Sequence, residues 1–317
     1  MKKIIVIGAT GSIGSKLCDT LLSKGDEVTV FTRNPDDAKM ILPDVNNFVE
    51  WNYNDGLDVP SSQNLHHTGW REELNGKDAI VHLAGANLGA KRWNEKYKKL
   101  CYDSRVISTR NLVEALKSVD QKPKVFICSS AVGFYGDRGD DILNENEPPA
   151  NNYLAKLCFD WEKEAATADA LGIRRVSIRT GLVLNKDEGL LKQMLPTFKM
   201  FLGGYLGNGK QWFPWIHIDD IVGIYLQAID NEEISGAVNA ASPGIARMKE
   251  FAKTLGNVLS RPALFPIPTS AVKILKGELG NYATDSQRIS TSKIIKSGYK
   301  FEFENLETAL RNLLLRL

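Results

Sequence analysis

Cysteine is scarce in this sequence, and long apolar runs are absent from it. Four cysteines occur among 317 residues, without a CxxC pair or a Cys/His cluster; they are Cys18, Cys101, Cys128 and Cys158. This spacing argues against a zinc site and against a disulfide framework. Free thiols favour a reducing compartment, and no apolar run approaches the length of a membrane span. We therefore expect a cytoplasmic protein without a metal site and without a membrane partner.

An excess of charge of one sign is also absent. The chain carries 40 Lys and Arg against 38 Asp and Glu, a formal net charge of +2. This balance gives no electrostatic reason to expect nucleic acid or an anionic membrane as the main partner. The fractions of hydrophobic (43%) and charged (25%) residues are ordinary for a globular protein. We expect a small-molecule substrate as the partner, and a homodimer stays an open alternative.

The N-terminal segment resembles a signal peptide only briefly. Two lysines precede an apolar run, but that run ends at Gly8 and is too short for a signal peptide. The β-branched residues from Lys3 to Ile7 instead predict a buried parallel strand. The apolar spacing from Ser12 to Lys24 then predicts an amphipathic helix.

Predicted strands and helices alternate along the first 180 residues. Strands are predicted at 3–7, 27–32, 48–51, 79–83, 125–129 and 175–179, and long helices at 12–24, 95–116 and 153–171. This alternation predicts an α/β protein with a Rossmann-type, doubly wound parallel sheet. The pattern loosens after about Gly181. We expect a Rossmann domain at 1–180 and a smaller substrate-binding lobe at 181–317, partly interwoven with the sheet.

A glycine-rich turn joins the first predicted strand to the first predicted helix. It reads GATGSIG, a GxxGxxG motif in the strand–turn–helix context that an NAD(P) site requires. Glycine lets the backbone approach a pyrophosphate, whose charge the amides and dipole of the helix N-terminus favour. The alternative is a turn without a ligand. The predicted cofactor contacts are Gly8, Thr10, Gly11, Ser12, Ile13 and Gly14.

The end of the second predicted strand distinguishes between two dinucleotides. Sites that prefer NAD usually carry Asp or Glu there, which accepts hydrogen bonds from the ribose. This chain has Arg33 instead. A guanidinium pairs strongly with a phosphate, so Arg33 favours NADP, with NAD as the alternative. A solvated surface arginine is the other interpretation.

Several motifs together resemble the extended short-chain dehydrogenase/reductase superfamily, which includes NAD-dependent sugar epimerases. The glycine turn, HLAG at 82–85 and SSAVGFYG at 129–136 are similar to its motifs. A subgroup named epimerase family proteins, with no assigned substrate, is a closer match; the segments concerned include Arg92-Trp93, Ser104-Arg105, Trp161-Glu162, RTGLVL at 179–184 and WIHIDD at 215–220. The resemblance spans nearly the whole chain. It implies nicotinamide chemistry and a cofactor beside Leu83, Ala84 and Gly85.

The resemblance also implies a catalytic pattern from which this chain departs. In the superfamily a Tyr transfers a proton, and a Lys four residues later lowers the pKa of that Tyr and holds the cofactor ribose. An upstream Ser or Thr helps to hold the substrate oxygen. Here Leu157 follows Tyr153 at that spacing, and Lys156 comes one position early. Ala131 stands where Ser or Thr is expected.

Three interpretations of the catalytic site stay open. In the first, Tyr153 is the acid/base and Lys156 assists it, because residues i and i+3 are still neighbours on a helix. In the second, Tyr135 takes that role, because its flanking glycines leave its hydroxyl near the cofactor. Whichever tyrosine acts, Ser130, just before Ala131, is the candidate hydroxyl. In the third, the site binds cofactor without turnover, and Tyr153 is a partly exposed residue at a helix start.

Two groups of basic and aromatic residues are candidates for binding substrate. The glycine-rich segment GGYLGNGKQW ends in Lys210, Gln211 and Trp212, which suit a phosphate, a hydroxyl and a sugar or base ring, respectively. Arg92 and Trp93 form a second group near the cofactor segment. The alternative for the loop is an ordinary surface segment with Trp212 packed inward.

These observations leave two functions open. The first is an NADP-dependent epimerase-like enzyme or oxidoreductase that transfers hydride on a small polar substrate, such as a nucleoside sugar. The second is a non-catalytic NADP(H)-binding sensor or assembly factor with a degenerate site, which Leu157 and Ala131 favour. Fold does not decide between them, because function depends on the site.

Replacing Arg33 with alanine tests the choice of dinucleotide. If its guanidinium pairs with a 2′-phosphate, Arg33→Ala should weaken NADPH binding by about tenfold or more, because a hydrogen bond to a charged group contributes roughly 1.5–3 kcal/mol. NADH binding should change little. Calorimetric titration of both dinucleotides measures this, and an equal loss for the two would refute the phosphate role.

Overall fold

The computed structural model describes residues 1–53 and 69–315, and its central parallel sheet confirms the predicted α/β class. In this part of the chain the sheet has seven strands in the order β12-β7-β5-β4-β1-β2-β3, all paired in parallel. The order reverses between β1 and β4, as in a Rossmann-type sheet. The strands are β1 (Lys3–Ile7), β2 (Glu27–Thr32), β3 (Asn47–Glu50), β4 (Ala79–His82), β5 (Val125–Ala131), β7 (Arg174–Thr180) and β12 (Gly236–Ala240).

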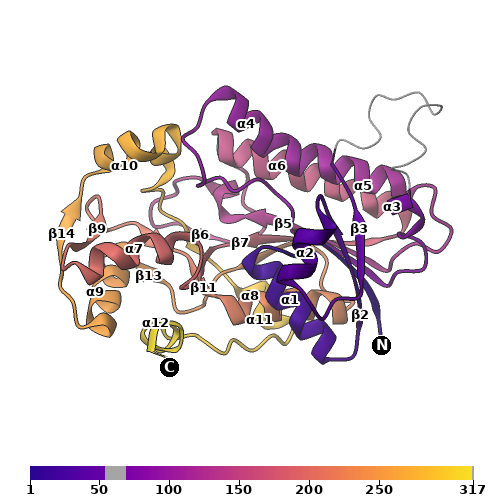
Figure 1. Cartoon of the computed structure of the whole chain (residues 1–317). Coiled ribbons are helices and arrows are strands. Elements are labelled where there is room, and N and C mark those ends of the chain that lie inside the picture. The colour runs from indigo at the N-terminus through magenta and orange to yellow at the C-terminus, as the bar shows by residue number, and fades with distance from the viewer. Residues whose placement is uncertain (54–68, 316–317) are drawn as a thin grey trace.

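Helices cover both faces of the sheet (Figure 1). One face carries α1 (Ser12–Ser23), α8 (Ile218–Asp230) and α11 (Ser292–Lys296). The other carries α4 (Glu95–Tyr102), α5 (Ser108–Leu116) and α6 (Tyr153–Ala166). The shorter helices of this region are α2 (Pro35–Ile41), α3 (Gly69–Glu72) and the 3₁₀ helices η2 (Val132–Tyr135) and η3 (Thr167–Leu171).

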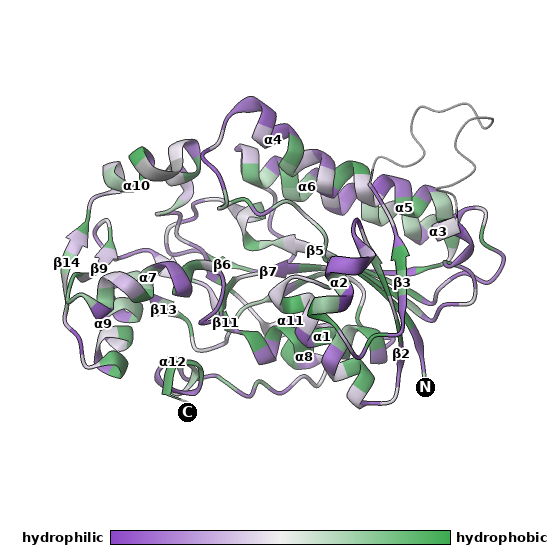
Figure 2. Cartoon of the chain, in the orientation of Figure 1, coloured by the Kyte–Doolittle hydropathy of each residue, from purple (hydrophilic) through white to green (hydrophobic). Residues whose placement is uncertain are grey.

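Alternation of side chains along the strands divides the core into two layers. Successive residues of a strand point to opposite faces, so Ile4 and Val6 pack on the side of α1 and α8. Ile5 and Ile7 pack on the side of α5 and α6. Figure 2 shows hydrophobic residues along the strands and polar residues on the outer turns of α4. A strand buried on both faces therefore reads as the continuous apolar run seen in the sequence.

The last third of the chain forms a second core beyond the carboxyl ends of the strands (Figure 1). Phe213 and Phe251 lie at its centre, with ring centroids 4.3 Å apart. The helices that pack in it are α7 (Gly189–Lys199), α9 (Met248–Leu259) and α12 (Leu306–Leu315). The same part of the chain also forms α10 (Thr269–Lys276) and η4 (Gly277–Tyr282), and η4 packs against Trp93. Its strands pair as β8 (Leu182–Leu184) with β11 (Trp215–His217), β9 (Gly203–Leu206) with β14 (Ala263–Ile267), and β10 (Trp212–Phe213) with β13 (Ala246–Arg247). In addition, β15 (Arg288–Ile289) pairs with β6 (Ile142–Leu143).

The chain returns to the main sheet before it completes this second core. After β11 it forms α8 and then β12, which pairs with β7 from Gly236 to Ala240. Ile221 and Ile224 of α8 are fully buried in the same layer as Ile4. Residues beyond 180 thus contribute to both cores, and the division of the chain near residue 180 stays a prediction.

The long helical segment predicted at 95–116 contains a wider turn in its middle. Helix α4 continues into the π-helical turn η1 (Asp103–Ile107), which leads into α5. Turns of this kind within α-helices are rare and frequently mark functional sites. His82, at the end of β4, is hydrogen bonded through Nε2 to the Ser108 hydroxyl at 3.0 Å. This buried contact joins the end of β4 to the start of α5, directly after the wider turn.

Acid should destabilise the protein through His82. Burial, and secondarily the charge of Arg105, lowers the pKa of this fully buried imidazole from 6.5 to about 3. Its contribution to stability is complete above pH 6.5 and is lost as pH falls toward 3, because only the unfolded chain binds the proton in that range. We expect the free energy of unfolding to fall by up to about 1.4 kcal/mol per pH unit.

Urea unfolding of the wild type and of His82→Phe across this pH range measures the effect. Phenylalanine suits the aromatic surroundings of His82, which include Trp51, Phe126 and Trp161. The difference between the two proteins isolates the titration of His82 from that of other groups. An identical pH dependence in both would contradict the assignment.

Candidate dinucleotide site

The glycine-rich turn leaves the start of α1 without a side-chain cap. Gly11 is the N-cap residue, and its amide donates to the Gly8 carbonyl at 3.2 Å. The Ser15 amide bonds back to the Gly11 carbonyl at 2.8 Å. The amides of residues 12–14 lie in the first turn of α1, where the helix has no earlier carbonyl to accept their hydrogen bonds. Together with the helix dipole they favour an anion such as pyrophosphate.

The three glycines of the motif have different steric roles. A Cβ on Gly14 would lie 2.4 Å from the Gly8 oxygen, so only glycine lets α1 pack this close to the turn. Gly8 has a φ of +84°, and a Cβ there would lie 2.7 Å from the Ala84 nitrogen. A Cβ on Gly11 would meet the Gly8 oxygen at an ordinary 3.6 Å. Gly11 and Thr10 are both exposed above the turn.

Two other predicted cofactor segments flank the turn, because β1 pairs with both β2 and β4. Arg33 follows β2 and is exposed, and its side chain has no hydrogen bond or ion pair with the described residues. Leu83 follows β4, and its amide donates to the Ile7 carbonyl at 2.8 Å. Ala84 is partly buried, and Gly85 is exposed. The structure therefore brings the three segments together at one edge of the sheet.

Tyr153 begins α6 and contacts α4. Its hydroxyl donates to the Lys98 carbonyl at 2.7 Å, and its ring meets the Trp93 ring edge-on at 5.3 Å between centroids. Burial raises the pKa of this phenol, nearby Cys101 raises it further, and the charge of Arg105 opposes the rise. In this arrangement Tyr153 holds its proton at neutral pH.

Lys156 is directed away from Tyr153. Its ammonium pairs with the Asp160 carboxylate at 2.6 Å, and its side chain is 68% exposed. Asp160 also accepts a hydrogen bond from the Tyr102 hydroxyl at 2.9 Å. Leu157, at the position of the superfamily's lysine, is 2% exposed and packs in the core layer. The structure does not bring Lys156 and Tyr153 together.

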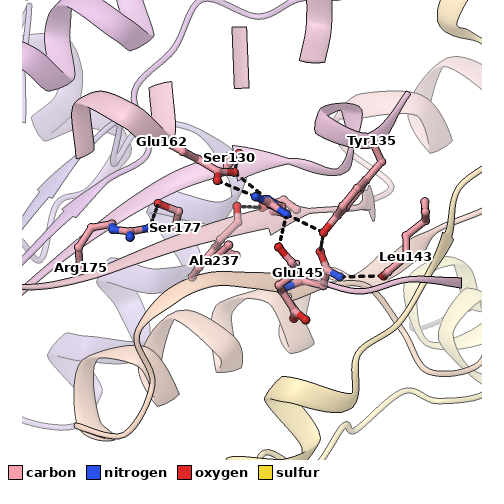
Figure 3. Close-up of polar contacts among 12 residues, drawn as sticks. Ser130, Tyr135, Leu143, Glu145, Glu162, Arg175, Ser177 and Ala237 are labelled. Carbon is pink, nitrogen blue, oxygen red and sulfur yellow. Dashed lines mark hydrogen bonds and ion pairs between the residues drawn. The ribbon is translucent and has the colours of Figure 1, made fainter. Parts of the chain in front are cut away.

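Ser130 and Tyr135 belong to a buried polar network centred on Arg179 (Figure 3). The Arg179 guanidinium contacts both oxygens of Glu162, at 2.8 and 2.9 Å. Ser130 donates to Glu162 at 2.6 Å. Tyr135 accepts from Arg179 at 2.8 Å and donates to Asn239 at 2.7 Å. These contacts join β5, β7, β12, α6 and η2.

Electrostatics keep Tyr135 and Arg179 of this network protonated at neutral pH. Burial raises the pKa of Tyr135 to about 12, although Arg179 acts in the opposite direction. Burial also works against the charge on Arg179, but the hydrogen bonds and charge of Glu162 outweigh it and raise the Arg179 pKa. The sequence placed Glu162 in a family motif without a role, and it gave no signal for Asn239. The hydrogen-bond partners of Glu162 and Asn239 lie on strands and helices that are distant in sequence, so only the folded structure shows them.

Lys210 and Gln211 have different surroundings. Lys210 is exposed and lines an open pocket beside α9 with Arg247, Lys249 and Lys253. Gln211 is 9% exposed, and its side-chain amide donates to the Leu206 carbonyl at 3.1 Å. None of the residues lining this pocket belongs to the glycine turn or to the ends of β2 and β4.

Trp212 has cations on its ring and a carboxylate at its edge. The guanidiniums of Arg247 and Arg288 lie 4.2 and 5.0 Å from the ring centroid. The indole nitrogen donates to Asp140 at 2.7 Å, and Arg247 pairs with the same carboxylate at 2.8 Å. Trp212 is thus half-buried within a polar cluster of the protein itself.

Arg92 and Trp93 lie where α4 meets the second lobe. Trp93 is 7% exposed, its indole donates to the Leu88 carbonyl at 2.8 Å, and its ring centroid is 5.8 Å from that of Tyr282. Arg92 is exposed and packs against Gly277, where a Cβ would come within 2.9 Å of its Cγ. The structure therefore brings Trp93 and Tyr153 together, whereas Gln211 and Trp212 belong to another part of the second lobe.

Within 1–53 and 69–315, no group of three or more His, Cys, Asp or Glu side chains is arranged to hold a metal ion. In the same ranges no helix is long and apolar enough to cross a membrane. The four cysteines are all buried and unpaired.

The chain matches the NAD dependent epimerase/dehydratase family over residues 4–241, and a domain of unknown function, DUF1731, over residues 267–313. This protein belongs to the NAD dependent epimerase/dehydratase family. An Arabidopsis thaliana relative, "Epimerase family protein SDR39U1 homolog, chloroplastic", is 34% identical over 97% of this chain and 85% of its own length. A relative from Staphylococcus haemolyticus, "Epimerase family protein SH2119", is 32% identical over 99% of each chain. The resemblance to the epimerase family proteins is confirmed.

Solved structures of related proteins share the fold of this epimerase-family chain. Human epimerase family protein SDR39U1, solved with NADPH, superimposes with a TM-score of 0.85 at 30% identity, over 99% of this chain and all of the human chain. A nucleoside-diphosphate sugar epimerase from Corynebacterium glutamicum gives a TM-score of 0.73 at 30% identity, over 99% of this chain and 58% of that one. These similarities agree with the Rossmann-type sheet described above.

Alanine substitutions at two glycines should separate folding from ligand binding. Gly14→Ala inserts a methyl group against backbone atoms, so we expect a loss of roughly 1–3 kcal/mol in unfolding free energy. Gly11→Ala fits the free protein, so its stability should stay near that of the wild type. Its methyl group should nevertheless hinder a pyrophosphate over the turn and weaken NADPH binding by about tenfold or more.

Urea unfolding and fluorescence titration with NADPH measure the two effects. Each variant is the control for the other, because both add one methyl group within the same motif. Unchanged NADPH affinity in Gly11→Ala would count against a pyrophosphate above the turn.

Proposed function

We propose that this protein binds NADP(H) at the carboxyl edge of its sheet and acts as an epimerase-like enzyme or oxidoreductase on a nucleoside sugar. One observation carries the proposal: the uncapped amides of residues 12–14 lie between the ends of β2 and β4. A dinucleotide spans such an edge with its pyrophosphate on the helix N-terminus. The NADPH in the human relative supports the same ligand here.

Arg33 supports NADP over NAD. Its guanidinium is exposed directly after β2 and has no hydrogen bond or ion pair among the described residues. Asn34, the next residue, is engaged as the N-cap of α2, where its side chain accepts from the Asp36 and Asp37 amides. Arg33 is therefore available for a 2′-phosphate, which it would bind through charge-assisted hydrogen bonds.

Positive charge in the second lobe supports a substrate that carries phosphate. The pocket beside α9 is lined by Lys210, Arg247, Lys249 and Lys253 and by one carboxylate, that of Glu250. Arg247 is already paired with Asp140, so the three lysines provide the excess positive charge. Nucleoside-diphosphate sugars carry two phosphates, and the Corynebacterium relative is named as an epimerase of such compounds. A reducing cytoplasm is the expected location, since the four cysteines are free.

Tyr153 is the residue we propose to carry the proton. The bound dinucleotide would supply the acceptor and donor of hydride. Because the Tyr153 hydroxyl donates to the Lys98 carbonyl, proton transfer requires it to rotate toward a substrate oxygen. Lys156 is engaged by Asp160, so a different cation has to lower the pKa of Tyr153.

A second candidate is a non-catalytic NADP(H) sensor or assembly factor. Three observations favour it: Leu157 and Ala131 replace the superfamily's polar groups, and the Tyr153 hydroxyl is already hydrogen bonded within the protein. This function requires the dinucleotide site but no proton transfer, so turnover separates the two candidates.

The experiment measures NADPH affinity and then turnover on a panel of UDP-, GDP- and dTDP-sugars, followed by proton NMR of the sugar. We expect tight NADPH binding and conversion of at least one sugar. Tyr153→Phe should lower kcat by about 100-fold or more without changing NADPH affinity, since general acid–base catalysis contributes at least that much.

Tyr102→Phe is the matched control, because it removes a phenol hydroxyl that donates to Asp160 on the same pair of helices. It should keep wild-type kcat. Full activity in Tyr153→Phe would exclude that residue as the proton carrier. Tight NADPH binding without turnover of any sugar would favour the sensor, and a failure to bind either dinucleotide would exclude both functions.

A further inference from the structure

The face of α6 that carries lysine in the superfamily is apolar in this chain. Tyr153, Leu157 and Trp161 follow one another at four-residue intervals and share a face of the helix. All three belong to or pack against the same core layer. A cation near Tyr153 therefore has to come from another element.

Arg105 is a cation on the neighbouring element. It lies in the π-helical turn η1, and its Cζ is 5.3 Å from the centroid of the Trp161 ring. Its charge lowers the pKa of Tyr153, against the effect of burial. The guanidinium thus reaches the face of α6 on which lysine is missing.

One nitrogen of Arg105 accounts for all of its hydrogen bonds within the described residues. Nη1 donates to the Ala86 carbonyl at 3.0 Å and to the Cys101 carbonyl at 3.1 Å. Both acceptors are backbone carbonyls, and no carboxylate in the described part of the chain pairs with the guanidinium. Burial lowers the pKa of Arg105. Arg105 is only partly buried, and a partly desolvated charge without a counter-ion is a natural partner for an anionic ligand.

The other two nitrogens of Arg105 lie over Gly85. A Cβ on Gly85 would be 2.7 Å from Cζ, 2.9 Å from Nη2 and 3.0 Å from Nε, so the guanidinium packs directly on the backbone of this glycine. Gly85 is exposed and belongs to the segment that follows β4 at the edge of the dinucleotide site. Nη2 and Nε have no acceptor among the residues that the structure describes, and both lie beside that edge.

We propose that Arg105 supplies, from the neighbouring helix, the positive charge that lysine supplies on α6 in the superfamily, and that Nη2 and Nε bind an oxygen of the bound dinucleotide. This inference rests on the proposed function, because it requires NADP(H) at the edge of the sheet. It accounts for the lysine missing at Leu157 and for the absence of a carboxylate partner of Arg105 among the residues that the structure describes. The π-helical turn sets the direction of the Arg105 side chain.

NADPH titration of the full-length protein tests the proposal with two substitutions at Arg105. Arg105→Gln keeps an amide that can donate to the Ala86 carbonyl but removes the charge, so we expect NADPH affinity to fall by about 10- to 100-fold. Arg105→Lys keeps the charge and should retain most of the affinity. Arg110→Gln is the matched control, since Arg110 lies on α5 and pairs with Glu164 at 2.6 Å; it should bind NADPH as the wild type does.

A second-site change gives a readout that a merely structural role would not affect. Leu157→Lys in the Arg105→Gln background restores a cation at the superfamily position and should recover part of the lost NADPH affinity. Thermal unfolding checks that each variant is folded. If Arg105→Gln is unfolded, Arg105→Lys decides: retained affinity supports the proposal, and lost affinity overturns it.

Two outcomes distinguish this proposal from the proposed function. If the wild type does not bind NADPH, the proposed function fails. If the wild type binds NADPH and folded Arg105→Gln binds it equally well, the role of Arg105 alone is overturned. Equal weakening in Arg105→Gln and Arg105→Lys, without recovery by Leu157→Lys, would likewise overturn it and assign Arg105 to the support of the Ala86 segment.

Discussion

Close contact between α1 and the turn after β1 is the constraint on which the candidate site depends. Gly14 packs so near the Gly8 carbonyl that no Cβ fits between them. This contact directs the uncapped amides of residues 12–14 toward the carboxyl edge of the sheet. Because β2 and β4 are both parallel neighbours of β1, Arg33 and the segment around Gly85 come to the same edge. The backbone therefore supplies hydrogen-bond donors to the candidate site before any charged side chain contributes.

A second constraint is the ion pair between Arg179 and Glu162, which holds the strands behind this edge. Both side chains are at most 11% exposed, and two short hydrogen bonds join them. Desolvation offsets much of the attraction in such a pair, so its net contribution to stability is small, although removing one partner typically costs about 3–5 kcal/mol. Its effect here is to fix β5, β7 and α6 relative to one another. Ser130 and Tyr135 use their hydroxyls in the same network, which leaves Tyr153 as the candidate phenol that is not fully buried.

Local patterns were sufficient to predict much of the fold. The apolar run of β1, the glycine turn and the spacing of α1 each depend on neighbouring residues, and the structure contains all three as expected. The partners of side chains were not predictable in this way. The sequence shows that Lys156 lies one position before the expected lysine. It does not show that the Lys156 ammonium pairs with Asp160, because that contact depends on the rotamers of both side chains and on their exposure to solvent. Trp212 could be identified as a stacking residue, but the guanidiniums on its ring come from residues 35 and 76 positions away in sequence.

The sequence by itself determined the α/β alternation, the glycine turn and the family, because hydrophobic periodicity and steric need for glycine are properties of short segments. Only the tertiary structure decided which charges meet. Arg105 lies 48 positions before Tyr153 in sequence. Because η1 packs near α6, the charge of Arg105 lowers the pKa of the Tyr153 phenol. Likewise, β12 joins the main sheet only after the chain has formed α7 and the first strands of the second lobe. Such contacts arise from the packing of distant elements, and electrostatic interactions depend on distance in space rather than on separation along the chain.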